Sequence, residues 1–245
     1  MFVLYEGPSL LDGTPIVACL TGADGSSRNV KTGGIAQTWI LLAGASPIDA
    51  AYDGRDAAIC GDCPHRASPG RPRGCYVNLA WAPRNIWKAY RAGRGLRVLP
   101  PVLPAVRLGA YGDPAAVPVD VWRDLVEIAG GHVGYTHQWR VFPELRDLCM
   151  ASVESAGEAI EAHAAGWRTF RTCFPRQDPG LLPQEVGCPA ARENRHATTC
   201  ARCGLCSGVR ETPRKSIVIN FHGTARPQPF QASLLTLLDT CQRSG

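Results

Sequence analysis

Cysteines are the residues of this chain whose type and spacing most clearly predict chemistry. Seven of the eleven fall into two short segments. The first segment has the spacing C-x2-C-x11-C and consists of Cys60, Cys63 and Cys75, with His65 inside it. The second has the spacing C-x11-C-x2-C-x2-C and consists of Cys188, Cys200, Cys203 and Cys206. Because a C-x2-C pair places two thiolates around one metal at a tight turn, we predict that both segments bind metal.

The cysteine spacing leaves two kinds of metal open. Four thiolates of the second segment fit tetrahedral zinc, but they also fit a 4Fe–4S cluster, whose ferredoxin signature includes C-x2-C-x2-C and a Cys-Pro pair. Cys188-Pro189 supplies that pair. In the first segment, either His65 completes a zinc site or the three cysteines hold a cluster with one open iron. Iron–sulfur is our preferred interpretation and zinc the alternative. The other cysteines have apolar neighbours and are interpreted as core or surface thiols: Cys19, Cys149, Cys173 and Cys241.

The two cysteine-rich segments, at about 53–75 and 188–215, interrupt an alternation of apolar runs and helical stretches. The runs predict strands at 16–20, 75–79, 105–110, 132–136, 148–153, 168–172, 185–188 and 216–221. Helices are predicted at 34–43, 83–93, 118–129, 155–165 and 229–241. This alternation, with about eight strands, favours a parallel α/β barrel or partial barrel. A barrel of roughly 250 residues often forms one domain, so we expect a single domain over 1–245.

Polar side chains gather where the predicted strands end. In a parallel barrel, chemistry takes place at the carboxyl ends of the strands. The residues expected there include Tyr111, Asp113, His137, Gln138, Arg140 and Glu154. Together they favour a pocket for a polar ligand. The alternative is that Asp113 only caps the next helix and that His137 is an ordinary loop residue.

These strand-end segments resemble a known family. Residues 110–118, 134–140 and 150–154 occur in the same order as strand-end motifs of a radical-SAM-like protein family of tailed phages and prophages. The whole chain also resembles a set of phage proteins with the same cysteine loops. Asp113-Pro114 looks like the Gly-Glu-Pro turn of radical S-adenosylmethionine (SAM) enzymes. These enzymes usually show C-x3-C-x2-C, whereas this chain has C-x2-C-x11-C.

The resemblance covers roughly residues 57–175 and implies a partial or complete radical-SAM-like barrel. It implies an iron–sulfur cluster on the first cysteine segment, with the methionine part of SAM near Gly112-Asp113-Pro114. Cofactor contacts are then expected from Tyr111, Gly112, Asp113, Pro114, Gln138 and Arg140. Catalytic roles are expected for Asp113, His137 and Glu154.

The leading hypothesis is thus an iron–sulfur enzyme that uses SAM and acts on an unidentified small molecule, nucleobase or nucleic acid. The second cysteine segment would then be auxiliary or structural. The rival hypothesis is a zinc-stapled protein that binds nucleic acid or modifies bases without radical chemistry. A third hypothesis is an accessory protein on a degenerate enzyme fold.

Charge and hydropathy add weaker expectations about partners and location. The formal net charge of +5 permits a polyanionic partner. Arg84, Lys88 and Arg91 share one predicted helix face, which could contact DNA or RNA but is otherwise a solvated face. The N-terminus lacks the basic and apolar regions of a signal peptide, and no run reaches the ~18 apolar residues of a membrane span. We therefore expect no membrane partner and a cytoplasmic protein, located in the host cytoplasm if it is phage-encoded.

Overall fold

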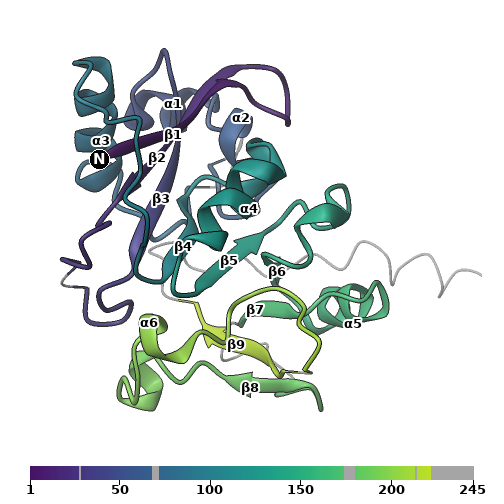
Figure 1. Cartoon of the computed structure of the whole chain (residues 1–245). Helices are drawn as coiled ribbons and strands as arrows, with labels where there is room; N and C mark the ends of the chain where they lie inside the picture. Colours follow the sequence, from purple (N-terminus) through teal and green to yellow (C-terminus); the bar gives the residue numbers. More distant parts are fainter. Residues whose placement is uncertain (28, 68–71, 174–179, 213, 222–245) are drawn as a thin grey trace, which may run out of the picture.

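The computed structural model describes residues 1–27, 29–67, 72–173, 180–212 and 214–221, and within these ranges the chain forms a mixed α/β fold around one nine-stranded sheet (Figure 1). The strands are β1 (Phe2–Pro8), β2 (Pro15–Thr21), β3 (Ala36–Leu42), β4 (Val106–Tyr111), β5 (His132–Thr136), β6 (Met150–Val153), β7 (Thr169–Cys173), β8 (Glu185–Gly187) and β9 (Ser216–Asn220). The α-helices are α1 (Pro47–Asp53), α2 (Ala57–Cys60), α3 (Ala82–Arg91), α4 (Val119–Glu127), α5 (Ala156–Ala164) and α6 (Cys200–Cys203). Short 3-10 helices are η1 (Pro114–Ala116), η2 (Pro143–Leu145) and η3 (Arg192–Asn194).

The sheet has the order β1-β2-β3-β4-β5-β6-β7-β9-β8. β1, β2 and β3 pair antiparallel, and every pair from β3 to β8 is parallel. The predicted parallel α/β class is therefore confirmed. Among the described strands the sheet does not close on itself, because β1 and β8 remain its edges. The arrangement agrees with a partial barrel and not with a complete one.

The parallel strands are covered by helices in the way that chain connectivity requires. Figure 1 shows α4 lying across β4 and β5, and α5 beside β6 and β7. Ser155 caps α5 as the sequence predicts: its hydroxyl accepts a hydrogen bond from the amide of Glu158 at 3.1 Å. Trp122 and Leu125 form the buried face of α4. Within the described residues, no helix combines the length and the apolar character needed to cross a bilayer.

Two predicted elements are wrong. Residues 34–43 were expected to be helical, but they contain β3, whose side chains are buried on both faces. A short apolar run buried on both faces has no period of its own, so it cannot be told from a buried helix. Residues 75–79 were expected to form a strand but are irregular, because this backbone is held by the Arg73 side chain, which donates to the carbonyls of Cys75 and Val77. The helix expected at 229–241 lies outside the described residues.

Candidate metal and ligand site

A cavity of about 430 Å³ lies along the parallel strands. Alternate residues of a strand point to the same face of its sheet. The cavity follows that rule along β5, where it is lined by Val133, Tyr135 and His137; on β4 it is lined by Arg107, Gly109, Ala110 and Tyr111. Its volume lies in the range of small-molecule sites.

The first cysteine loop forms one wall of this cavity. Cys60 ends α2, Cys63 follows on the next turn, and Cys75 returns after the intervening loop; all three line the cavity. Arg66 holds the loop together. Its guanidinium donates to Asp56 at 2.7 and 2.9 Å and to the carbonyls of Gly54 and Gly61, both at 2.8 Å. The buried Asp56 carboxylate gives this arginine its counter-charge.

The cysteine loop is joined directly to the strand-end turns. The amide of Asp113 donates to the carbonyl of Ile59 at 2.6 Å, and the Gln138 side chain donates to Asp62 at 2.5 Å. Gly61 lies between them with φ +56°, and a Cβ there would collide with the Gln138 amide. Glycine is therefore required at this turn.

Burial strongly affects the thiols of both loops. It raises the pKa of Cys60 well above its ordinary value, and neighbouring Cys63 raises it further. Burial likewise raises the pKa of Cys75, while nearby Arg73 lowers it. In the second loop burial raises the pKa of Cys206 to about 12, although a hydrogen bond with Tyr135 lowers it. These thiols therefore stay protonated at neutral pH unless a cation binds and releases the protons.

Asp113 is buried at the end of β4 and fully hydrogen-bonded. Its Oδ1 accepts from the Thr136 hydroxyl at 2.7 Å and from the Ala115 amide at 3.0 Å, and its Oδ2 accepts from the His137 amide at 2.8 Å. It therefore caps η1 and also lines the cavity. Burial raises the pKa of this carboxyl despite these bonds. The sequence offered two interpretations of Asp113, a helix cap and a pocket residue, and in the structure it is both.

His65, His137 and Glu154 form a compact group beside the first cysteine loop. Glu154 Oε1 lies 2.9 Å from His137 Nε2 and 3.2 Å from His65 Nε2. Burial would raise the pKa of Glu154, but the hydrogen bonds from His137 and His65 outweigh it and lower this pKa to about 2. Cys63 Sγ lies 3.9 Å from His137 Nε2, so the group touches the cysteine loop. Both histidines line the cavity.

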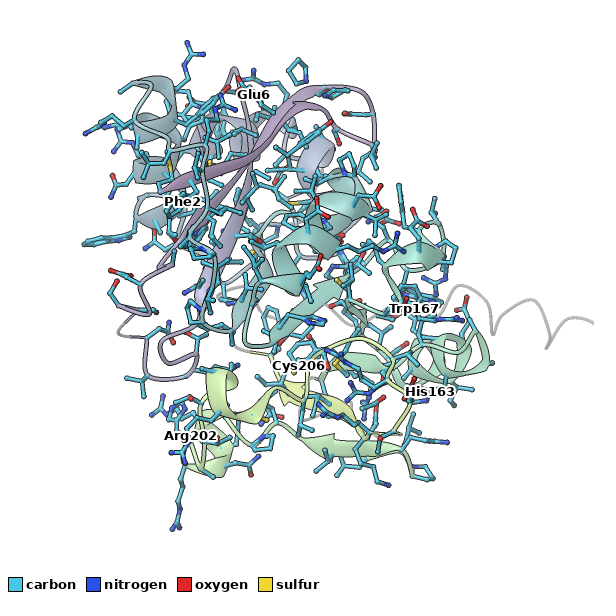
Figure 2. All side chains as sticks on the ribbon, in the orientation of Figure 1. Phe2, Glu6, His163, Trp167, Arg202 and Cys206 are labelled. Atoms are coloured by element: carbon cyan, nitrogen blue, oxygen red, sulfur yellow. The ribbon has the colours of Figure 1, made fainter. Side chains whose placement is uncertain are left out.

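The second cysteine loop is organised by one buried arginine from the start of β7. Arg168 donates to backbone carbonyls of the loop, including Ser207 at 2.5 Å, Leu205 at 2.8 Å and Lys215 at 2.6 Å. Cys188, Cys200, Cys203 and Cys206 all line one small pocket. Figure 2 shows Cys206 in the interior of the molecule and Arg202 of α6 on the outside. Cys200 also lines the large cavity, so both cysteine loops reach the same space.

Ligand spacing differs between the histidine–glutamate group and the cysteine loops. Among the described residues, one group of three candidate metal ligands has all its ligand atoms within 4.8 Å of one another, namely His65, His137 and Glu154. By this measure neither cysteine loop gathers three sulfurs that closely. No disulfide forms among the described cysteines.

The other predicted site residues are distributed unevenly. Tyr111 and Gly112 line the cavity, and Pro114 is buried at the start of η1. Gln138 supports the first cysteine loop through its hydrogen bond to the Asp62 carboxylate. Arg140 lies outside the cavity lining, because its guanidinium binds Glu161 of α5 at 2.6 and 2.8 Å. The basic residues proposed for nucleic-acid contact are exposed on α3: Arg84, Lys88 and Arg91.

Several cavity residues were missed by the sequence reasoning. Arg107 lies four residues before Tyr111 on β4, Tyr135 lies two residues before His137, and Phe170 lines the cavity from β7. The alternation of side chains along each strand was the available signal, since Arg107 shares a face with Tyr111. Lys31 and Thr32 also line the cavity; the sequence Lys31-Thr-Gly-Gly34 indicates an anion-binding turn before a helix, but it precedes the strand β3 instead.

The chain matched no protein-family model, no curated protein and no solved structure.

Proposed function

We propose that this protein is an iron–sulfur enzyme of the radical-SAM-like type, with a 4Fe–4S cluster held by Cys60, Cys63 and Cys75. The observation that carries the proposal is the position of these three thiols. They form one wall of a cavity of small-molecule size next to the carboxyl ends of β4 and β5. Three protein thiolates leave one iron of a 4Fe–4S cluster open to a ligand in that cavity.

The turn after β4 suits the methionine part of SAM. Gly112 lines the cavity with φ +83°, and a Cβ there would collide with Ile40, so this turn requires glycine. Asp113 fixes this turn through its hydrogen bonds to Thr136, Ala115 and His137. The buried Tyr111 hydroxyl has no protein partner among the described residues. When bound, the cluster would supply one-electron reduction of the SAM sulfonium.

The chain's own residues would bind, orient and exclude water. Glu154 orients His137 and His65 beside the cysteine loop. The Tyr135 and Phe170 rings, with centroids 4.2 Å apart, line the cavity and provide apolar surface that would exclude water from the bound substrate. The second loop would hold an auxiliary metal centre near the same cavity, through Cys188, Cys200, Cys203 and Cys206.

A zinc-stapled nucleic-acid-binding protein is the second candidate. Two observations favour it: the close spacing of His65, His137 and Glu154, and the exposed basic face of α3. Two histidines and one carboxylate are common zinc ligands. In this case the cavity would have no cofactor role.

Anaerobic purification with metal analysis separates the two candidates. An iron–sulfur protein should be brown, contain iron and acid-labile sulfide, and bleach on reduction, since thiolate-to-iron charge transfer absorbs visible light and zinc does not. Cys60→Ala should remove the first cluster and abolish SAM cleavage, whereas Cys203→Ala should mainly lower stability. Cys19→Ala, in the β2 core, is the matched control that should keep the metal content. A colourless protein with stoichiometric zinc and no iron contradicts the proposal.

A further inference from the structure

One end of the cavity, beside α6, carries positive charge that no carboxylate among the described residues pairs with. Lys31 and Arg107 both line the cavity, and both lie near Cys200 of α6. Among the described residues, the Arg107 guanidinium has one hydrogen-bond partner, the Tyr76 hydroxyl, and no carboxylate. Its Nε is buried and unpaired. A partly buried arginine with no counter-charge among the described residues favours the binding of an anion from solution.

A second buried group at this end also lacks a partner. Thr32 is almost fully buried, lines the cavity, and its hydroxyl has no hydrogen-bond partner among the described residues. The loop that carries Lys31 and Thr32 is tied to α6: their carbonyls accept from the amides of Cys200 and Ala201 at 2.9 and 3.0 Å. The position of the two side chains is therefore set by the fold.

The acidic group on the cavity wall cannot neutralise this end. Asp113 lies at the opposite end of β4, and its oxygens already accept three hydrogen bonds. Arg107 pairs with Gln37 near the start of β4, whereas the turn at Gly112 follows the last residue of β4, so the two lie at different ends of this strand.

We propose that Arg107, Lys31 and Thr32 form an oxyanion-binding subsite for the substrate, which carries a carboxylate or a phosphate. Arginine binds both groups through paired hydrogen bonds, and lysine adds a point charge. The Tyr135 and Phe170 rings lie along the same cavity and would cover the apolar part of the molecule. This inference rests on the enzyme function proposed above and names its substrate class.

A competing explanation is that Arg107 and Lys31 only balance the negative charge of a metal-bound Cys200 thiolate. Burial raises the pKa of Cys200, whereas the positive charges of both side chains lower it. The two explanations make different predictions. A charge-balancing pair leaves the cavity without affinity for anions. Removing Arg107 would then lower the metal content of the second loop.

The test is isothermal titration of the anaerobically purified, metal-loaded protein with inorganic phosphate and, separately, with benzoate. We expect saturable one-to-one binding of at least one probe, and the stronger probe identifies the anion as phosphate or carboxylate. Arg107→Gln should weaken that binding roughly tenfold to a hundredfold, the usual effect of a hydrogen bond to a charged group. Thr32→Val should weaken it less. Arg123→Gln, an exposed arginine of α4 paired with Asp120, is the matched control and should bind as the wild type does.

Metal analysis of the same samples keeps the two proposals distinguishable. A brown, iron-loaded protein that binds neither probe overturns the anion subsite and leaves the iron–sulfur function standing. A colourless zinc protein whose phosphate or benzoate binding depends on Arg107 supports the subsite and overturns the iron–sulfur function. If Arg107→Gln binds the anion as tightly as the wild type does, the subsite is overturned. The subsite is also overturned if the wild type binds neither anion and Arg107→Gln loses metal. If Arg107→Gln does not fold, Thr32→Val gives the same comparison.

Discussion

Acidification from pH 7 to pH 4 should destabilise the fold through His132. This residue begins β5 and is buried, and burial together with nearby Arg210 lowers its pKa to about 4 from the ordinary 6.5. Between these two values the unfolded chain binds a proton that the folded chain does not. The free energy of unfolding therefore falls as the pH drops from 6.5 towards 4, and this contribution stops changing below pH 4.

The size of the effect follows from the shift. A difference of roughly 2.5 pKa units, at about 1.36 kcal/mol per unit, gives about 3 kcal/mol as an order of magnitude. His132→Phe keeps a ring in the site and removes the titrating group. We therefore expect the variant to be as stable as the wild type near pH 4.5 or more so, although it loses the contact with Arg210 at neutral pH.

Urea unfolding measured from pH 7 to pH 4 gives the comparison. The informative quantity is the difference between wild type and variant at each pH, because other groups titrate equally in both. Arg123→Gln, at the exposed arginine of α4, is the control and should follow the wild-type curve. Parallel curves for wild type and His132→Phe over this range would refute the reasoning.

Three further predictions test other parts of the structure. Glu154→Gln should destabilise the fold by about 1–3 kcal/mol at pH 6, and the difference from wild type in urea unfolding should shrink as the pH falls from 4.5 to about 2, where Glu154 itself becomes protonated. Glu185→Gln removes the carboxylate that binds buried Arg171 at 2.7 and 2.8 Å and should lower stability by about 3–5 kcal/mol in thermal unfolding; an unchanged midpoint would contradict this. Gly61→Ala should displace the first cysteine loop against Gln138 and lower its metal content, whereas Gly44→Ala, which meets nothing nearby, should not.

The sequence predicted those features that depend on local pattern. The capping box before α5, the strands β4, β5 and β7 and the helix α4 were all recognisable, because each has its own periodicity or boundary residues. β3 was mistaken for a helix because burial on both faces removes that periodicity. β1 was missed: its pairing with β2 places an exposed edge strand at the start of the chain, where the apolar signal is weak.

The candidate site was predictable residue by residue but not as a whole. Asp113 and His137 could be placed at strand ends, since parallel strands present their carboxyl ends to one edge. Arg140 could not be excluded, because its partner Glu161 lies on α5, a full helix away along the chain. The Arg140 guanidinium binds Glu161 at the surface and also lies 4.0 Å from the Trp139 ring centroid.

The relation between the two cysteine loops depends on the order of the strands. More than one hundred residues separate Cys75 from Cys188. They approach one cavity because β9 inserts between β7 and β8 and because the loop at Lys31 docks on α6. Neither event leaves a periodic pattern in the sequence. A site that joins both cysteine loops to two cations without a carboxylate partner among the described residues is therefore a property of the topology, and Arg107 becomes interpretable only when the strands are in place.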